Sequence, residues 1–298
     1  MESEILFTIA IPVYNGEKSL SRAIESVLNQ DYDSDYEVLI VNNASTDHTE
    51  EIIEKFHDSK IKVVNNKETV SLFCNHNICL KNARGKYILF CHADDELYTI
   101  ALSVLDKELK RLNYPTRFII WGHSLFRDFS WALQQAHLPV NQVFSGEAAY
   151  DAFAFGGLTP SGTCYSRKSL LEIGGFPLLK NRLQPCDWSI LWKTVFSGFE
   201  YEMIDRLIFK RVDATTASRN VSFSDTLEAN RECMRELFKT LNERQIEIVK
   251  STIGRMNPNY SFPLFKEYIP KKMRIRFYIS SFIRHPRAWR KTIQLIKC

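Results

Sequence analysis

Two adjacent carboxylates, Asp94 and Asp95, follow the apolar residues 87–91 after two intervening residues, His92 and Ala93. Adjacent carboxylates repel each other unless a cation or hydrogen-bond donors offset their charge. A hard divalent ion such as Mg²⁺ or Mn²⁺ would do this, because it prefers oxygen ligands and can bridge to phosphate groups. The pair could also begin a solvated helix, since acidic residues are favourable in the first turn. The residue types alone leave both interpretations open.

A third carboxylate, Asp187, begins an aromatic-rich segment that includes Trp188 and Trp192. Aromatic neighbours can partly desolvate a carboxylate, which raises its pKa and makes it a better general base. The alternative is an N-cap residue above a packed aromatic face. The chain lacks the GxGxxG fingerprint after its first strand, the P-loop, and the HExxH and GxSxG motifs. Dinucleotide dehydrogenases, P-loop kinases, zincins and α/β-hydrolases therefore do not fit.

The elements that must position these residues alternate between strand and helix. Apolar runs predict strands at 6–13, 37–41, 61–64, 87–91 and 118–121. Apolar residues at helical spacing predict helices between them, at 20–28, around 52–56, at 76–84 and at 97–112. This alternation predicts βαβ crossovers and an α/β fold with a mostly parallel, doubly wound sheet. Ligands bind beyond the carboxyl ends of such strands, where Tyr14, Asn42, Asn43, Asp94 and Asp95 fall.

The second part of the chain has a less regular pattern. A small-residue loop at 156–166 and a helix ending at 170–175 precede an expected helix at 187–196 and a strand at 204–211. From residue 223 onward the pattern is helical, with prolines interrupting it. We therefore predict a catalytic domain at 1–222 and a helical, basic C-terminal extension at 223–298. Earlier in the chain, Gly85 is expected to follow the third helix as its C′ residue.

Six segments, in order, resemble the family 2 glycosyltransferases over residues 5–220. They are FTIAIPVYNGEKSLSRAIESVLNQ, VLIVNNASTDHT, NHNICLKNARGKYILF, HADDE, SRKSLLEIGGF and PCDWSILWKTVFSG. The resemblance implies the GT-A fold and an inverting, single-displacement transfer of a sugar from a nucleoside-diphosphate donor to an acceptor hydroxyl. It is to the bacterial type that builds surface polysaccharides, for which the acceptor is a saccharide or a lipid-linked saccharide.

The resemblance also implies roles for individual residues. Asp187 would be the catalytic base that takes the proton from the acceptor hydroxyl. Asp94 and Asp95 would hold Mg²⁺ or Mn²⁺ and, through it, the diphosphate. The full set implied to bind the donor is Pro12, Val13, Tyr14, Asn42, Asn43, His76, Asp94, Asp95 and Arg211.

Several of these positions depart from the family pattern. Asn42 and Asn43 stand in the loop after the second strand, where Asp is frequent. His76 stands where Arg is common, and His92 occupies the first position of the DxD pattern. The sequence therefore leaves open which base and sugar the donor carries, how strongly the metal binds, and which acceptor and linkage are used.

Two other classes of function stay open. A catalytically silent protein that binds nucleotide sugars would keep the same fold, although the joint presence of Asp94, Asp95 and Asp187 argues against it. A sugar nucleotidyltransferase would need a glycine-rich, basic triphosphate loop after the first strand. The segment PVYNGEKS matches such a loop poorly, because it has one glycine and one lysine.

Charge and composition add expectations about location. The net charge is +4, but residues 271–298 hold nine basic residues and no acid, interleaved with aromatic and aliphatic ones. This predicts an amphipathic helix on an anionic membrane surface, or a segment packed on the catalytic domain with a solvated basic face. Nucleic acid is not expected, because no recognition motif accompanies the charge. No apolar run reaches about 18 residues, no signal precedes the first strand, and seven cysteines are scattered without metal-ligand spacing. We expect a cytoplasmic protein with reduced thiols that could lie peripherally on the inner face of the cell membrane.

Overall fold

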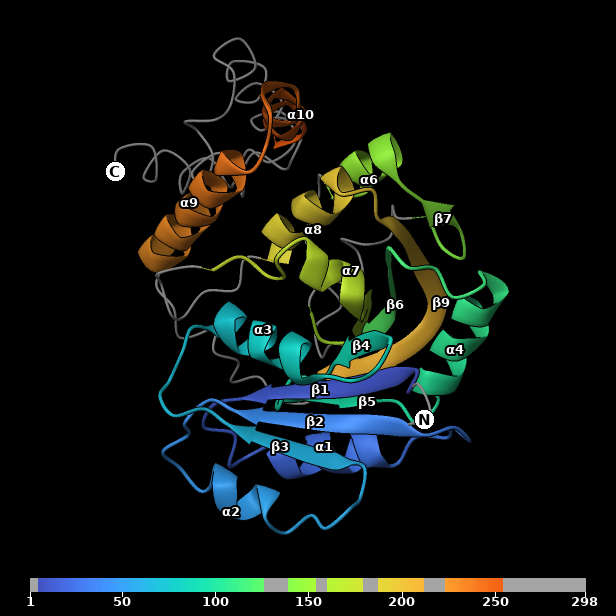
Figure 1. The fold of residues 1–298 in the computed structure, drawn as a ribbon, viewed down its shortest axis with the longest axis vertical. Helices are drawn as coiled ribbons and strands as arrows, with labels where there is room; N and C mark the ends of the chain where they lie inside the picture. Colours follow the sequence, from blue (N-terminus) through green and yellow to red (C-terminus); the bar gives the residue numbers. More distant parts are fainter. Residues whose placement is uncertain (1–4, 126–138, 154–159, 179–186, 212–222, 254–298) are drawn as a thin grey trace, which may run out of the picture.

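The structure is a computed structural model that describes residues 5–125, 139–153, 160–178, 187–211 and 223–253 of the 298-residue chain (Figure 1). The described strands form one nine-stranded sheet with helices on both faces. The predicted α/β fold is therefore confirmed. None of the helices within these ranges combines the length and hydrophobicity of a membrane span.

The first part of the chain folds into parallel βαβ units. Its elements are β1 (Phe7–Val13), α1 (Leu20–Leu28), β2 (Tyr36–Asn42), α2 (Thr49–Ile53), β3 (Ile61–Asn65), α3 (Leu72–Asn82) and β4 (Tyr87–Phe90). The strands lie in the order β3-β2-β1-β4, and every pairing among them is parallel. We name these four strands the parallel half of the sheet. The strands predicted here are confirmed, with bounds shifted by a residue or two.

The next part of the chain completes the sheet with both strand directions. Its elements are β5 (Asp95–Leu97), α4 (Ala101–Arg111), β6 (Phe118–Leu125), β7 (Val143–Phe144), α6 (Gly146–Phe153), β8 (Thr163–Ser166), α7 (Arg167–Glu172), α8 (Asp187–Phe196) and β9 (Glu200–Arg211). The sheet continues from β4 in the order β8-β6-β9-β5, and β7 pairs with β9. Only β6 and β9 run parallel to each other. We name these five strands the mixed half of the sheet.

Two further helices, α9 (Phe223–Lys239) and α10 (Glu243–Ile253), follow the sheet. They pack against α8 and α6 respectively (Figure 1). Cys233 of α9 is fully buried in the core that the sheet shares with these helices. The predicted helical character from residue 223 is confirmed as far as residue 253. The predicted boundary at 222 and the tail at 271–298 lie outside the described residues.

The sheet separates two hydrophobic cores because side chains alternate between its faces. On one face, Leu39 and Val41 of β2 pack with α3, α6, α7 and α8. On the other face, Val38 and Ile40 of the same strand pack with α1, α2 and α4. Burial of β2 on both faces explains why its sequence is an almost unbroken apolar run. The five described thiols whose state is resolved, Cys74, Cys79, Cys91, Cys164 and Cys233, are free.

Three local expectations need correction. Residue 97 does not begin a helix: Asp95–Leu97 is strand β5, and α4 begins only at Ala101. Long-range pairing overrides local preference here, because β5 forms an antiparallel ladder with the far end of β9. The interpretation of Asp94 and Asp95 as the first turn of a helix is therefore wrong. The third helix also begins earlier, at Leu72, because the side chain of Ser71 caps it by accepting a hydrogen bond from Cys74 N.

Gly85 is not the C′ residue of α3, since the helix already ends at the cap residue Ala83. Its role is close packing instead. A Cβ at this position would lie 2.4 Å from the backbone nitrogen of Thr8 and 2.6 Å from the carbonyl carbon of Phe7. Glycine therefore lets the chain enter β4 directly against β1.

Candidate active site

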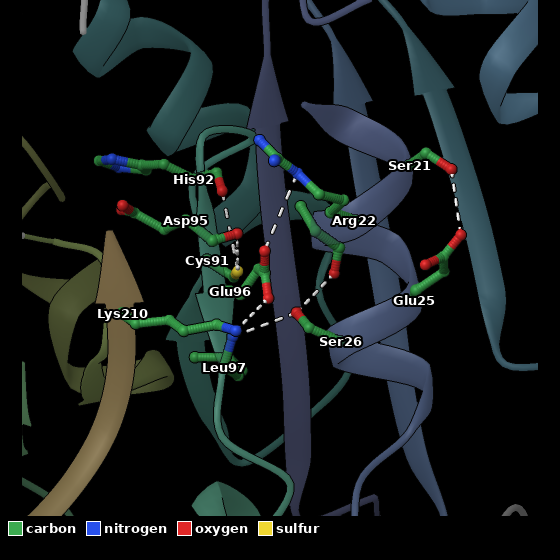
Figure 2. Close-up of polar contacts among 11 residues, drawn as sticks. Ser21, Arg22, Glu25, Ser26, Cys91, His92, Asp95, Glu96, Leu97 and Lys210 are labelled. Carbon is green, nitrogen blue, oxygen red and sulfur yellow. Dashed lines mark hydrogen bonds and ion pairs between the residues drawn. The ribbon is translucent and has the colours of Figure 1, made fainter. Parts of the chain in front are cut away.

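A cluster of three possible metal ligands lies where the loop after β4 enters β5. His92, Asp94 and Asp95 each offer a ligand atom, and these atoms lie within 4.8 Å of one another. Asp95 is buried, with 1% of its surface exposed, whereas His92 and Asp94 are partly exposed. Figure 2 shows the His92 ring and the Asp95 carboxylate leaving the loop in the same direction. The cluster thus presents one imidazole and two carboxylates to a common point.

Hydrogen bonds from the backbone and from a buried thiol fix the backbone of this loop. The amide of Asp95 donates to the carbonyl of His92 (3.0 Å), which closes the turn. The buried thiol of Cys91 contacts the carbonyls of His92 and Asp95 at 3.7 and 3.6 Å (Figure 2). Burial raises the pKa of this thiol well above its usual value, as do the nearby acids, so it stays protonated and can donate. The amide of His92 donates to Ser161 Oγ (3.1 Å) from the segment before β8.

Glu96 points away from the cluster, because successive residues of a strand face opposite sides of the sheet. Its carboxylate pairs with Lys210 of β9 at 2.7 Å and with Arg22 of α1 at 3.9 Å (Figure 2). The next amide along β5, that of Leu97, donates to Ser26 Oγ of α1 (3.1 Å). Strand β5 is therefore tied to elements on both sides of it, which fixes where Asp95 lies.

The two histidines at which the sequence departs from the family pattern are in contact. His76 Nε2 lies 3.0 Å from His92 Nε2, and His76 Nδ1 lies 2.8 Å from the carbonyl oxygen of Leu72. His76 is fully buried, and its ring packs against Phe90 and Phe176 with centroids 4.9 and 5.3 Å away. Desolvation, together with the nearby His92, lowers the pKa of His76 to about 3. His76 is therefore a neutral imidazole.

The loops after β1 and β2 lie beside this cluster at the carboxyl edge of the sheet and are bonded to each other. Asn15 N donates to Ser45 Oγ (3.0 Å), and Thr46 N donates to Asn15 Oδ1 (2.8 Å). Gly16 N donates to Thr49 Oγ1 (2.8 Å). A Cβ on Gly16 would lie 3.5 Å from Ala93 Cβ, so the first loop also contacts the loop that carries the acids.

Asp47 is the centre of this loop pairing. Its carboxylate accepts hydrogen bonds from the amides of Glu17 (3.0 Å) and Thr49 (3.1 Å) and from the hydroxyl of Thr49. Desolvation alone would raise the pKa of Asp47, but the hydrogen bonds from Thr49 and from the backbone outweigh it and lower the pKa. The ionised carboxylate therefore holds the two loops together.

The predicted donor-binding residues at the ends of β1 and β2 differ in exposure. Pro12 and Val13 are buried, whereas Tyr14 is 51% exposed and leaves a ring free of the core. Asn42 is buried, and its Oδ1 accepts from Ser45 N (3.1 Å). Asn43 is buried as well. Its amide group bonds to the carbonyl of Val70 (3.0 Å), the amide of Val70 (2.9 Å) and the side chain of Asn66 (2.9 Å).

For two other predicted site residues, Arg211 and Asp187, the structure describes the position of the backbone. Arg211 is the last residue of β9 and is paired with Asp95 in the antiparallel ladder. Asp187 is the first residue of α8. The side chains of Arg211 and Asp187 lie outside the described residues. Helix α8 itself is fixed where Lys193 Nζ donates to the carbonyl of Gly175 (3.0 Å).

The turn that receives Lys193 is also bonded to α3. Asn77 exchanges two hydrogen bonds with the backbone of Phe176, at 2.9 and 2.8 Å. Gly174 and Gly175 have φ angles of +83° and +64°, and a Cβ on Gly175 would lie 2.3 Å from Asn77 Oδ1. The paired glycines therefore allow a close connection between α3, which carries His76, and α8, which begins with Asp187.

The residues present fit a divalent ion. Two carboxylates and one imidazole are ligand types that Mn²⁺ and similar ions accept, and they converge from a loop with a fixed backbone.

The structure also identifies residues that sequence reasoning missed. Ser161, Glu96 and Lys210 support the cluster, but their contacts join segments far apart in the chain. The His76–His92 contact had a signal, since both positions depart from the same family pattern.

Comparison with known proteins gives a consistent result. The model of Glycosyl transferase family 2 matches residues 8–172, which is more than half of the chain. Poly(ribitol-phosphate) beta-N-acetylglucosaminyltransferase TarS of Staphylococcus aureus (strain Mu50) is 35% identical over 92 residues, which cover 30% of this chain and 16% of TarS. UDP-Glc:alpha-D-GlcNAc-diphosphoundecaprenol beta-1,3-glucosyltransferase WfgD of Escherichia coli is 36% identical over 92 residues, which cover 31% of this chain and 36% of WfgD. The matched stretch is thus a minor part of each of these proteins.

Solved structures share the fold over nearly the whole chain. TarS 1-349 of S. aureus, in complex with UDP-GlcNAc, has a TM-score of 0.67 and 18% identity, covering 90% of this chain and 83% of that one. The mannosyltransferase PcManGT from Pyrobaculum calidifontis, in complex with GDP-Man and Mn²⁺, has a TM-score of 0.63 and 18% identity, covering 99% and 84%. At this identity the likeness establishes the fold, which is the GT-A fold of these transferases.

Proposed function

Because the chain belongs to glycosyltransferase family 2, we propose that it transfers a sugar, with inversion, from a nucleoside-diphosphate donor to an acceptor hydroxyl. The observation that carries this proposal is the convergence of three features at the carboxyl edge of the sheet. These are the His92, Asp94 and Asp95 cluster, the paired loops after β1 and β2, and the exposed ring of Tyr14. Ligands of doubly wound sheets bind at this edge.

In the proposed complex the nucleoside lies over the parallel half of the sheet. Tyr14 is exposed enough to stack on the base, because its ring is not part of the core. The ends of β1 and β2 and the loops after them, with Pro12, Val13, Asn42 and Asn43, line the nucleoside. Asn43 acts through loop geometry, because its amide already bonds to Val70 and Asn66. His76 acts through His92, because it is fully buried.

The diphosphate lies at the connection between the two halves. A divalent ion held there by Asp94 and Asp95 would stabilise the negative charge that develops on the departing diphosphate. Arg211 is the second proposed diphosphate contact, and its place opposite Asp95 in the β5–β9 ladder supports this role. Arginine suits it because the guanidinium is always charged and matches phosphate oxygens.

Asp187 is the proposed general base on the acceptor side. It takes the proton of the acceptor hydroxyl while that oxygen attacks the anomeric carbon of the sugar and the bond to the diphosphate breaks. The sugar passes to the acceptor with inverted configuration, and the nucleoside diphosphate leaves. The position of Asp187 at the start of α8, which is tied to α3 through Lys193 and Gly175, supports this assignment.

A donor screen tests the proposal. The full-length protein is incubated with UDP-, GDP- and dTDP-sugars and with Mg²⁺ or Mn²⁺, and release of the nucleoside diphosphate is measured with and without saccharide acceptors. We expect one donor to be turned over, faster with acceptor than without. Tight donor binding with no turnover under any condition would instead favour a silent binding protein.

We further propose that the acceptor is a lipid-linked saccharide and that residues 271–298, which lie outside the described residues, bring the enzyme to an anionic membrane. The support is the nine basic residues interleaved with aromatic and aliphatic ones, each worth about 1 kcal/mol near an anionic surface. Sedimentation with phosphatidylglycerol-containing vesicles, at low and high salt, compares the full chain with one ending at Ile269. Salt-sensitive pelleting of the full chain alone is expected. Equal pelleting of both proteins, or of neither, would contradict the proposal.

A further inference from the structure

His76 and His92 form a hydrogen-bonded relay whose proton positions can be assigned. A carbonyl oxygen only accepts hydrogen bonds, so the 2.8 Å contact of His76 Nδ1 with Leu72 O requires a hydrogen on Nδ1. Full burial among aromatic rings keeps the His76 imidazole neutral, and a neutral imidazole carries one N–H. His76 Nε2 therefore holds a lone pair and accepts.

The donor to that lone pair is His92. Its Nε2 lies 3.0 Å from His76 Nε2, so this nitrogen carries the hydrogen and donates it. In the neutral form of His92 the lone pair then lies on Nδ1. The chain of contacts runs from the Leu72 carbonyl through His76 to His92, and each step fixes the tautomer of the next. Metal-bound histidines are oriented in the same way, with the second ring nitrogen donating to a fixed acceptor.

We propose that His92 is a third protein ligand of the metal, binding through Nδ1 beside Asp94 and Asp95, and that His76 is the positioning residue that selects this tautomer. The proposal rests on the proposed function in one respect, since it concerns the same metal site. It adds a nitrogen ligand where the family pattern has an acid. The geometry supports it, because the His92 ring leaves the loop on the side of the Asp95 carboxylate and one of its ring nitrogens lies within the same 4.8 Å cluster (Figure 2).

A nitrogen ligand changes which ion the site prefers. Oxygen ligands suit Mg²⁺, Ca²⁺ and Mn²⁺ alike, whereas an imidazole nitrogen suits first-row transition metals, Mn²⁺ among them, better than the hard ions Mg²⁺ and Ca²⁺. The site should therefore bind Mn²⁺ and Co²⁺ more tightly than Mg²⁺. Replacing His92 by Asp should return it to an all-oxygen site. We expect the preference for Mn²⁺ over Mg²⁺ to fall about tenfold in that variant.

The test uses full-length protein and Mn²⁺ alone, with no donor present. Pulsed EPR of bound Mn²⁺ detects a directly coordinated nitrogen, and titration of the free Mn²⁺ signal gives the Kd. The variants are His92→Ala, His92→Asp and His76→Phe, and the matched control is His123→Ala. His123 is a suitable control because its ring is hydrogen-bonded to Asp205 on β9, which belongs to neither the metal-ligand cluster nor the histidine relay. Mg²⁺ affinity follows from competition in the same titration.

The wild type and the His123→Ala control should show the nitrogen coupling, and both His92 variants should lose it. Mn²⁺ affinity should fall about 10- to 100-fold in His92→Ala and about tenfold in His76→Phe, the usual cost of losing a metal ligand's support. No nitrogen coupling in the wild type would overturn the proposal, as would unchanged Mn²⁺ affinity in His92→Ala. Wild-type affinity and coupling in a folded His76→Phe protein would remove the role of His76.

The outcomes separate this proposal from the proposed function. A nitrogen-coordinated Mn²⁺ in a protein that turns over no nucleotide sugar would leave the site intact and refute the transferase. A metal-dependent transferase without nitrogen coordination would support the proposed function and refute the assignment of His92 as a ligand. If His76→Phe does not fold, the His92 variants still decide the ligand assignment, because His92 lies on a partly exposed loop.

Discussion

The loops at the carboxyl edge of the parallel half and the strands of the mixed half hold their polar residues by different means, although buried Glu37 of β2 also forms an ion pair, with Arg84 at 2.8 Å. In the parallel half, the loops after β1 and β2 are joined by hydrogen bonds between side chains and backbone amides, with Asp47 at the centre. In the mixed half, ion pairs join distant segments. Glu96 pairs with Lys210 at 2.7 Å, and buried Glu202 pairs with Arg111 at 2.6 Å. The loops of the parallel half are thus fixed by hydrogen bonds between residues 30 or 31 positions apart, whereas the ion pairs of the mixed half join residues much farther apart in the chain.

This difference assigns separate tasks to the two halves. In the proposed complex, loops closed by hydrogen bonds at adjacent strand ends would form a rigid floor for the nucleoside. The mixed half places charged and titratable groups, which suits the diphosphate and the acceptor. The acid cluster lies in the connection between the two halves, since β4 belongs to one half and β5 to the other. Variants in each half should therefore affect different steps.

The largest effect is expected on the acceptor side, in Asp187→Asn. Loss of a general base should lower the transfer rate about 10²- to 10⁴-fold. Donor affinity should be unchanged, because the parallel half and the connection between the halves are intact. Transfer rates and donor Kd are measured together, with the exposed Asp205→Asn as the matched control. Near-wild-type turnover would remove Asp187 from the mechanism, and a large loss of donor affinity would break the division of tasks.

A smaller effect is expected at the connection between the halves. Asp94→Ala should weaken Mn²⁺ binding and donor binding together, by about 10- to 100-fold each, because the metal couples the carboxylate to the diphosphate. The linkage is checked by measuring donor affinity with Mn²⁺ and with excess EDTA. In EDTA the wild type should bind donor no better than the variant. Full activity of the wild type in EDTA would contradict the metal role and shift diphosphate stabilisation to Arg211.

The same division explains what the sequence could predict. Strands β1, β2 and β4 are fully buried apolar runs, so local pattern is enough to place them. The residues at their ends, such as Tyr14 and Asp94, are then placed by topology alone. Helix α8 was also predicted with its observed bounds, because its apolar pattern is local.

The mixed half was less predictable because its strands are short and pair over long distances. The three residues of β5, which include Asp95 and Glu96, resemble the approach to a helix in sequence, but pairing with β9 makes them a strand. Strand β8 was read as part of a small-residue loop, and its pairing with β4 and β6 decides its structure. The departures from the family pattern single out His76 and His92 as residues, but their contact depends on how α3 packs against β4, which a single sequence does not show.

Glycine substitutions compare how tightly each half is packed. Gly85→Ala, in the parallel half, would place Cβ 2.4 Å from the backbone of Thr8. Gly162→Ala, in the mixed half, would place Cβ 2.0 Å from the ring of Phe209 at a φ of +74°. Each should lower the free energy of unfolding by about 3 kcal/mol. The control Gly146→Ala has a φ of +55° but no atom within 4 Å, and should lose about 1 kcal/mol.

Urea unfolding measures these losses, and a second substitution separates the two sites. Phe209→Leu should recover part of the loss in Gly162→Ala, with a coupling energy of about 1 kcal/mol, because the clash there is with a side chain. It should not rescue Gly85→Ala, where the neighbouring atoms are backbone. Equal coupling at both positions would show that the two halves do not differ in this respect.

The smallest effect expected is also the most direct contrast between the halves, because Asp47 and Glu202 should respond to pH with opposite signs. The folded pKa of Asp47 lies below its ordinary value of 3.8, as hydrogen bonds from Thr49 and the backbone outweigh desolvation. Its contribution to stability is therefore present above pH 3.8 and lost as the pH falls through the folded pKa. The folded pKa of Glu202 lies above its ordinary value of 4.5, because desolvation outweighs the attraction of Arg111. Its contribution is present below pH 4.5 and lost as the pH rises through the folded pKa.

Unfolding of the wild type, Asp47→Asn and Glu202→Gln is measured from about pH 3 to about pH 8. The stability advantage of the wild type over Asp47→Asn should shrink toward acid pH, and its advantage over Glu202→Gln should shrink toward neutral pH. Each change should be about 1 kcal/mol or less, the scale of one hydrogen bond. Glu202 Oε2 is buried without a hydrogen-bond partner among the described residues, so neutralising this group removes a cost that ionised Glu202 carries at neutral pH. If both stability advantages changed in the same direction with pH, the ion pair with Arg111 would fully offset the cost of burying ionised Glu202. The mixed half would then be held as rigidly as the loops of the parallel half.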